Sequence, residues 1–149
     1  MKNVNLNRKD KMSLKFLNEH DEIDYNLYQG GIPTNLDKFQ YVINLVGTQR
    51  YHVPIGRTVI IYPFNDAPII PNEEKLFELS ELAVKYSNRG PTLIHCAMGV
   101  NRSGLVMALT LMNRNGLSAK EAIELIRGKR SEECLSNKTF EEWLLNLKI

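Results

Sequence analysis

The sequence predicts an α/β protein built on a single, mainly parallel sheet that is flanked by helices. Short apolar runs bounded by turn residues alternate along the chain with longer stretches that carry apolar residues at helical spacing. Strands that are joined through helices run parallel, and such a sheet is covered on both faces. With 149 residues, of which 43% are hydrophobic, the chain has the size of one domain with a substantial core.

Four stretches have the composition and length of strands or strand pairs, namely residues 22–31, 41–46, 58–62 and 92–94. The first alternates apolar and polar residues and ends at Gly30 and Gly31, which favour a turn. The other three are nearly continuous apolar runs, which indicates strands that are buried on both faces. Residues 49–57 are expected to form a loop in which His52 lies at the surface.

Four helices are predicted from capping signals and apolar stripes. Asn72 is a favourable N-cap, and Ser118 with Glu121 forms a capping box for a later helix. Residues 105–112 are apolar on every side, which is typical of a buried helix. A charged linker, residues 127–133, is expected before a last helix with an apolar stripe of Phe140, Trp143, Leu144 and Leu147.

Charge and composition indicate the compartment and the kinds of partner to expect. The formal net charge of +2, from 19 basic and 17 acidic residues, does not indicate a nucleic-acid or membrane partner. No apolar run has the length of a signal-peptide core or a membrane span. We therefore expect a cytoplasmic monomer with a polar N-terminal extension, residues 1–20, that carries at most one short helix. Cys96 and Cys134 do not make a disulfide framework, and Cys134 is expected to be a surface or half-buried thiol.

One stretch joins the last predicted strand to the buried helix, and it reads His95, Cys96, Ala97, Met98, Gly99, Val100, Asn101, Arg102 and Ser103. The first N–H groups of a helix lack internal partners, and the helix dipole attracts anions to this end. Five residues separate Cys96 from Arg102, so their backbone N–H groups can wrap around a phosphate. The guanidinium of Arg102 matches two phosphate oxygens, and positive surroundings favour the nucleophilic thiolate of Cys96. The sequence therefore predicts a phosphate site that faces a nucleophile.

His95-Cys96, five further residues and Arg102-Ser103 resemble the signature loop of the cysteine-dependent protein phosphatases. Residues 27–31 are similar to a passage near the start of the dual-specificity type, and the resemblance covers residues 22–147. It implies a protein-tyrosine-phosphatase-like fold, with a catalytic domain at residues 21–149. It also implies hydrolysis of phosphotyrosine, phosphoserine and phosphothreonine in phosphorylated proteins through a cysteinyl phosphate, without a metal or another cofactor.

The resemblance also assigns roles to single residues. Cys96 is the nucleophile, and the phosphoryl group is bound by Ala97, Met98, Gly99, Val100, Asn101 and Arg102. Asp66 is the candidate general acid, because it lies on a proline-stiffened loop thirty residues before Cys96, a separation similar to that in dual-specificity phosphatases. Ser103 would donate a hydrogen bond to the Cys96 sulfur when it departs. His95 would orient the loop and help keep Cys96 ionised.

Each of these residues also has a plainer interpretation. Cys96 can be a small buried hydrophobe at a strand end, Asp66 a turn or capping carboxylate, and Ser103 a helix cap. Glu73 and Glu74 are the runners-up for the acid, although their place in the first turn of a helix already explains them.

The chain departs from the family pattern at two places, and the first of them leaves an alternative open. Asn101 stands where dual-specificity loops usually have Ser, and residues 99–102 are similar to the loop of metal-independent RNA 5′-triphosphatases. Those enzymes usually lack the general-acid Asp, so Asp66 counts against RNA 5′ ends or other polyphosphates as substrates. A non-catalytic phosphate-binding adaptor is the third alternative. Before the last helix the family commonly has Pro-Asn, whereas this chain has Ser136-Asn137.

Overall fold

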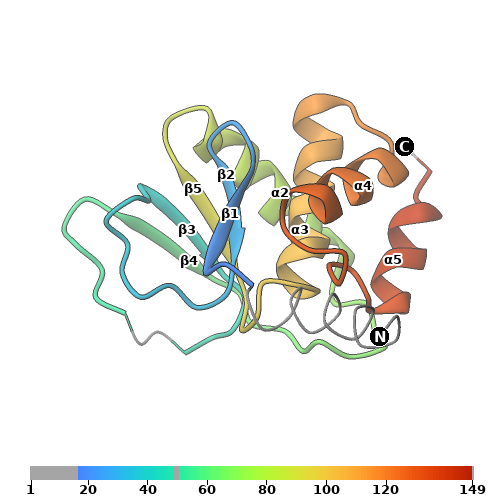
Figure 1. The fold of residues 1–149 in the computed structure, drawn as a ribbon, viewed down its shortest axis with the longest axis horizontal. Coiled ribbons are helices and arrows are strands. Elements are labelled where there is room, and N and C mark those ends of the chain that lie inside the picture. The colour runs from blue at the N-terminus through green and yellow to red at the C-terminus, as the bar shows by residue number, and fades with distance from the viewer. Residues whose placement is uncertain (1–16, 49–50, 149) are drawn as a thin grey trace, which may run out of the picture.

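The computed structural model describes residues 17–48 and 51–148, and its centre is a five-stranded sheet of order β1-β2-β5-β3-β4 (Figure 1). The strands are β1 (His20–Asp24), β2 (Leu27–Gly30), β3 (Tyr41–Asn44), β4 (Thr58–Ile61) and β5 (Thr92–His95). The helices are α2 (Glu73–Ser87), α3 (Arg102–Asn115), α4 (Ala119–Lys129) and α5 (Lys138–Leu145). Only β1, at one edge, is antiparallel to its neighbour. The predicted fold class, a single mainly parallel sheet flanked by helices, is therefore confirmed.

The central strand β5 determines where the signature loop lies. In the register of the sheet, His95 at its end is aligned with Gly30 of β2 on one side and with Asn44 of β3 on the other. The carboxyl ends of parallel strands meet at one edge of a sheet, and ligands commonly bind there. Cys96 follows β5 directly, so the sheet places it at this edge, between the ends of two neighbouring strands.

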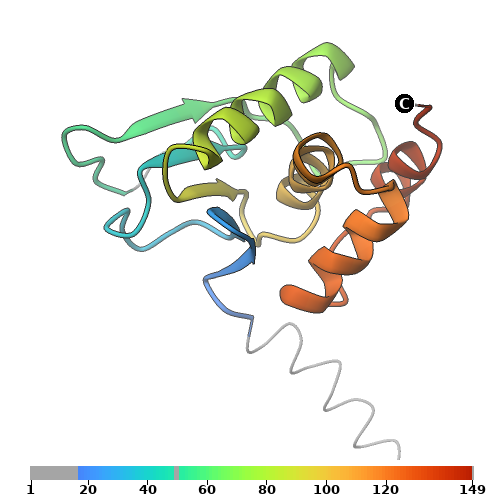
Figure 2. The ribbon, with the colours of Figure 1, turned by 90° about the horizontal axis from the view of Figure 1, so that it is seen from above.

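The two faces of the sheet are covered differently. Alternate strand residues such as Ile43 and Ile94 belong to the larger core, which contains the buried side chains of the four helices. Their neighbours Val42 and Leu93 belong to a smaller core that is completed by residues from two loops, Leu36, Phe39 and Tyr51. Both faces are covered, as expected, but in the described part of the chain the helices gather on one side of the strands (Figure 2).

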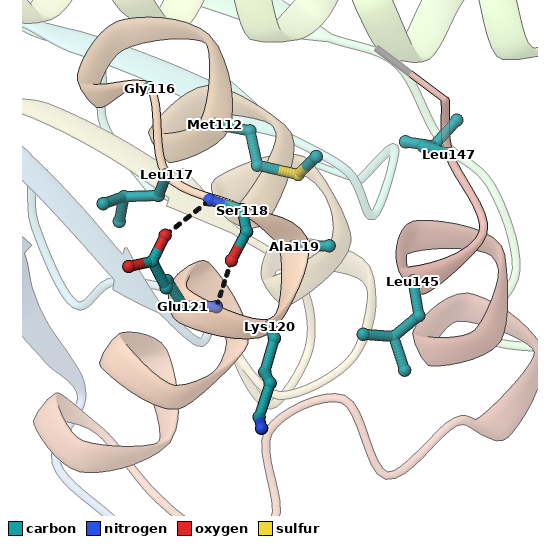
Figure 3. Close-up of a pocket in the computed structure, with 9 residues that line it drawn as sticks. All are labelled: Met112, Gly116, Leu117, Ser118, Ala119, Lys120, Glu121, Leu145 and Leu147. Atoms are coloured by element: carbon teal, nitrogen blue, oxygen red, sulfur yellow. Dashed lines mark hydrogen bonds between the residues drawn. The ribbon is translucent and has the colours of Figure 1, made fainter.

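Several predicted caps are present. The Asn72 side chain accepts a hydrogen bond from the Lys75 N–H at 3.1 Å. Ser118 and Glu121 form the reciprocal capping box of α4, whose two bonds are drawn in Figure 3. The predicted start of the linker at residue 127 is wrong, because α4 continues to Lys129. Arg127 Nη2 donates to the Glu141 carboxylate of α5 at 2.7 Å, and this ion pair extends the helical packing into the predicted linker.

Other expectations concern the ends and the surface of the molecule. The extension at residues 1–20, with the short helix that was expected in it, lies mostly outside the described residues. His52 is exposed, as predicted, while residues 49 and 50 of its loop lie outside the described part. No helix within residues 17–48 and 51–148 combines the length and the hydropathy needed to cross a membrane.

The core contact between α5 and the loop after β4 is open to a direct test. Phe140 of α5 is fully buried, and its ring centroid lies 6.3 Å from that of Phe64. Phe140→Ala should lower the free energy of unfolding by about 3–5 kcal/mol, because it removes buried apolar surface and leaves a cavity. Urea denaturation measures this change. Leu145 of the same helix is 49% exposed, and Leu145→Ala should cost about 0.5 kcal/mol or less; equal losses in both variants would contradict the assignment of this core.

Candidate active site

The predicted site residues meet at one cavity of about 380 Å³ beyond the end of β5. It is lined by Asp66, Cys96, Ala97, Met98, Val100, Asn101, Arg102, Glu133 and Ser136. The lining therefore contains the candidate nucleophile, the candidate acid, the arginine and most of the predicted phosphate-binding loop. Gly99 and Ser103 do not line the cavity, but both contact the sulfur of Cys96.

The sulfur of Cys96 lies among hydrogen-bonding groups. The side chain is buried, and the backbone N–H of Gly99 donates to Sγ at 3.2 Å. The hydroxyl oxygen of Ser103 lies 3.4 Å from Sγ. A thiolate can only accept hydrogen bonds, so an ionised sulfur would receive one from each of these groups. Both contacts stabilise negative charge on the sulfur.

Ser103 does not cap its helix. Asn101 occupies the N-cap position of α3, and Arg102 is the first residue of the helix. Ser103 is fully buried in the first turn, with its hydroxyl oxygen facing the Cys96 sulfur. This geometry fits the role that the resemblance implies and leaves the capping interpretation without support.

The guanidinium of Arg102 lines the cavity and is only partly bonded to the protein. Its Nη1 donates to the backbone oxygen of Phe64 at 3.2 Å, which fixes the direction of the side chain. Its Nε is buried and has no hydrogen-bond partner among the described residues. A buried donor without a partner is costly, and an anion bound in the cavity would satisfy it. The residues present thus fit a phosphoryl group.

His95 is a buried, neutral histidine. Its Nδ1 lies 3.3 Å from the backbone oxygen of Cys96 and its Nε2 lies 2.7 Å from the Tyr51 hydroxyl. A carbonyl oxygen only accepts, so Nδ1 carries the proton and the Tyr51 hydroxyl donates to Nε2. Asn44 Nδ2 donates in turn to that hydroxyl at 3.2 Å. Burial lowers the pKa of His95 to about 4. The imidazole is therefore uncharged, and it bonds to the backbone at the start of the loop.

Asp66 lies at the rim of the cavity and is exposed. Each of its carboxylate oxygens accepts a hydrogen bond from an asparagine side chain, Oδ2 from Asn101 at 3.0 Å and Oδ1 from Asn137 at 2.8 Å. The runners-up Glu73 and Glu74 do not line the cavity, and Glu73 accepts a hydrogen bond from Trp143 Nε1 at 3.3 Å instead. Asp66 is thus the only one of the three predicted carboxylates at the cavity.

Sequence reasoning missed the side chains that hold the loop from outside. Arg130 has a side chain only 1% exposed, and it donates to the backbone oxygens of Met98 at 3.0 Å and Gly99 at 2.7 Å. Gln29 Nε2 also donates to the oxygen of Gly99, at 3.0 Å. A peptide group points its N–H away from its carbonyl, so fixing the Met98 oxygen directs the Gly99 N–H towards Cys96. No local motif marks Arg130, whereas Gln29 falls within the passage that resembles the family.

Cys134 differs from its prediction. It is completely buried rather than at or near the surface, because residues 131–135 fold back against the signature loop, residues 95–103. The Leu135 N–H donates to the backbone oxygen of Val100 at 3.2 Å, and Gln29 Nε2 lies 3.7 Å from the Cys134 sulfur. Burial raises the pKa of Cys134 to about 11. Its thiol is therefore protonated near neutral pH.

A larger hollow, of about 610 Å³, lies away from this chemistry, between the end of α3, the start of α4 and the end of the chain (Figure 3). Its charged lining residues are Lys120 and Glu121, and Glu121 is engaged in the capping box. Among the described residues no cysteine or histidine lines it, and the hydroxyl oxygen of Ser118 accepts the Glu121 N–H in the capping box. The smaller cavity at Cys96 is therefore the candidate active site. Within residues 17–48 and 51–148 no cluster of three His, Cys, Asp or Glu side chains is arranged to hold a metal ion.

Comparison with known proteins decides the family. The model of the dual specificity phosphatase catalytic domain matches residues 27–149. The chain belongs to this family. Among curated relatives, the dual specificity protein phosphatase OPG106 of vaccinia virus (strain Western Reserve) is 31% identical over 68% of this chain and 61% of its own length. The human RNA/RNP complex-1-interacting phosphatase is 30% identical over 70% of this chain and 34% of its own length. The chain thus spans less than two thirds of these relatives.

Solved structures agree on the fold. OH1 from the Orf virus, described as a tyrosine phosphatase, superposes with a TM-score of 0.70 at 21% identity and covers 87% of this chain and 86% of its own. Human DUSP28 superposes with a TM-score of 0.69 at 19% identity, and the match covers 84% of this chain and 94% of the DUSP28 chain. The dual-specificity phosphatase fold and the resemblance to cysteine-dependent phosphatases are therefore both confirmed.

Gly99 provides a test of the loop geometry. Its φ is +73°, and a Cβ at this position would collide with the backbone carbonyl of Gly30. Gly99→Ala should lower kcat/KM for an aryl phosphate by about a hundredfold, the cost of a displacement near 1 Å at a reacting centre. Gly116 is the matched control, with a φ of +68° and no atom within 4 Å of an added Cβ. Gly116→Ala should lower stability by about 1 kcal/mol and leave kcat/KM unchanged; equal activity of the two variants would contradict the steric argument.

The neutral state of His95 predicts a pH dependence of stability. Between pH 4 and the ordinary histidine pKa of 6.5, the unfolded chain binds a proton at this residue that the folded chain does not. The free energy of unfolding should therefore fall, by about 3 kcal/mol from this group, as the pH is lowered from about 6.5 to about 4. Urea denaturation across this range should show a smaller fall in His95→Gln. Tyr51→Phe should still show the loss of stability at low pH, because burial and not the Tyr51 hydroxyl is the main cause of the low pKa of His95. If His95→Gln lost as much stability as the unchanged protein over this pH range, the neutral state of His95 would be contradicted.

Proposed function

We propose that this chain is a protein phosphatase that hydrolyses phosphotyrosine and phosphoserine or phosphothreonine monoesters through a cysteinyl phosphate. The observation that carries the proposal is the Cys96 sulfur, which accepts the Gly99 N–H and faces the Ser103 hydroxyl in a cavity that Arg102 and Asp66 also line. The proposed nucleophile, anion-binding group and acid thus line the same cavity.

In the first step the Cys96 thiolate attacks phosphorus and the bond from phosphorus to the leaving oxygen breaks. Charge in this transition state spreads over the transferring oxygens and the leaving group. Arg102 and the backbone N–H groups at the start of α3 bind the transferring oxygens, and the Nε of Arg102 gains a partner. Asp66 gives its proton to the leaving oxygen, which departs as an alcohol or a phenol.

In the second step water cleaves the cysteinyl phosphate. Asp66, now a carboxylate, takes a proton from the water that attacks phosphorus, and the bond from sulfur to phosphorus breaks. The sulfur leaves with the electron pair, and the hydrogen-bond donors at Gly99 and Ser103 stabilise the returning thiolate. Phosphate is released and the free thiolate is restored. A thiolate nucleophile requires a reducing compartment, which supports a cytoplasmic location.

The charges of the cavity lining favour monoesters over polyphosphates. The lining carries one guanidinium, Arg102, and two carboxylates, Asp66 and Glu133. A single phosphoryl group is met by the guanidinium and the loop N–H groups. The further phosphates of a triphosphate would meet the Glu133 carboxylate and no second cation of the lining, and like charges repel. Phosphorylated side chains of proteins therefore fit the lining better than RNA 5′ ends.

Hydrolysis at RNA 5′ ends is the second candidate. Asn101 in the loop favours it, as does the likeness to the human RNA/RNP complex-1-interacting phosphatase. The presence of Asp66 at the cavity and the acidic lining argue against it. Cys96, Arg102 and Asp66 are all in place, and this argues against a purely phosphate-binding adaptor.

A substrate panel tests the proposal. We expect turnover of phosphotyrosyl and phosphoseryl peptides and of an aryl phosphate, with little release of phosphate from triphosphate-ended RNA. Cys96→Ser should abolish turnover of every substrate while binding is retained, because a hydroxyl in place of the thiolate is a far weaker nucleophile. Phosphate release and equilibrium binding to a phosphopeptide measure the two effects. Selective activity on RNA, or full activity of Cys96→Ser, would overturn the proposal.

A further inference from the structure

Two asparagine side chains hold the Asp66 carboxylate, and nothing in the proposed chemistry explains why both are there. Asn101 comes from the catalytic loop and Asn137 from the residue that precedes α5. Each donates to a different oxygen of Asp66, at 3.0 Å and 2.8 Å. The acid is thereby joined to two elements that lie 35 and 71 residues further along the chain.

The orientation of both amides is fixed by their other hydrogen bonds. Oδ1 of Asn101 accepts the backbone N–H of Asn137 at 2.9 Å, so its amide nitrogen must face Asp66. Oδ1 of Asn137 accepts the backbone N–H of Phe140 at 3.2 Å, which likewise leaves its nitrogen facing Asp66. Amide oxygens accept and amide nitrogens donate, so reversing either side chain would set donor against donor. The network therefore has one consistent arrangement.

Asn137 also holds the backbone beside the acid. Its Nδ2 donates to the carbonyl oxygen of Ala67 at 3.0 Å as well as to Asp66. Asp66 itself is exposed and belongs to no helix or strand. An exposed carboxylate without such partners would sample several rotamers. The two asparagines thus restrict both the side chain of the acid and the loop that carries it.

We propose that Asn101 and Asn137 are positioning residues that hold Asp66 for proton transfer, an inference that rests on the proposed function. Each oxygen of Asp66 has two acceptor sites, and the asparagines occupy one on each. The remaining sites are free for the proton, so Asp66 can give it up and take it back while both amide bonds persist. Asn101 belongs to the phosphate-binding loop at the same time, and so it links the position of the acid to that of the phosphoryl group.

The test uses Asn137→Ser and Asn101→Ser. Serine is as good an N-cap as asparagine, so Asn137→Ser keeps the cap of α5 while it removes both amide donations. We expect kcat for an alkyl phosphate, a poor leaving group, to fall about tenfold, and kcat for an activated aryl phosphate to change less than twofold, because only the former depends on the acid. Asn101→Ser removes the other donor. Because Asn101 also lines the phosphate cavity, this variant should slow both substrates, with the loss for the alkyl phosphate about tenfold larger than the loss for the aryl phosphate.

A matched control separates positioning from helix stability. Asn72 caps α2 with the same kind of bond, to the N–H of the third residue of its helix, and contacts no part of the cavity. Asn72→Ser should leave both substrates unaffected. If Asn137→Ser slowed the aryl and alkyl phosphates equally, its role would be structural and the inference would be wrong. Urea denaturation of all three variants checks that each is folded.

Asp66→Ala completes the design. Alone, it should lower kcat for the alkyl phosphate by about 10²–10⁴-fold, with a smaller effect on the aryl phosphate. Adding Asn137→Ser to Asp66→Ala should cause no further loss, because Asn137 acts through the acid. If Asp66→Ala showed no dependence on the leaving group, the acid role in the proposed function would fail. If it showed that dependence and the asparagine variants did not, only the positioning role would fail.

Discussion

The active site depends on the way in which the carbonyl groups of Met98 and Gly99 are held. Arg130 binds both of them from a nearly inaccessible position, and Gln29 binds the second. These bonds turn the peptide groups of the loop so that an N–H reaches the Cys96 sulfur. Without these bonds to its carbonyl oxygens, nothing would fix the Gly99 N–H in its direction towards the Cys96 sulfur. The guanidinium of Arg102 lines the cavity, and that of Arg130 holds the loop from outside it.

The edge of the sheet brings the loop close to its neighbours. The Cys96 N–H donates to the backbone oxygen of Gly30 at 3.2 Å, and Gly99 lies against the same peptide group. Neither glycine has room for a Cβ. A Cβ on Gly30 would collide with Glu19 and His20, and one on Gly31 would collide with the backbone oxygen of Ala97 in the loop. The two glycines of the passage at residues 27–31 that resembles the family therefore have a physical reason.

Much of the site could be predicted because its residues lie within one short segment. Cys96, Arg102 and Ser103 occupy a single strand, loop and helix, so their spacing alone placed them together. Asp66 needed the resemblance, since only the spatial arrangement brings its loop to the cavity. Tyr51 was missed because it lies in the loop after β3 and meets His95 through the strand order, which puts β5 beside β3. Arg130 was missed because it ends α4 and reaches the loop only through the tertiary packing. Cys134 was misjudged because its burial depends on the return of residues 131–135 against Val100, a contact that no local pattern marks.

Arg130 reaches the opposite way as well, to the edge strand. Its Nη1 donates to the Asp21 carboxylate of β1 at 2.8 Å and to the backbone oxygen of Asn18 at 3.0 Å. The same guanidinium therefore joins the edge strand to the loop that carries the Cys96 thiol. The shape of that loop is thus tied to a part of the chain that does not line the cavity.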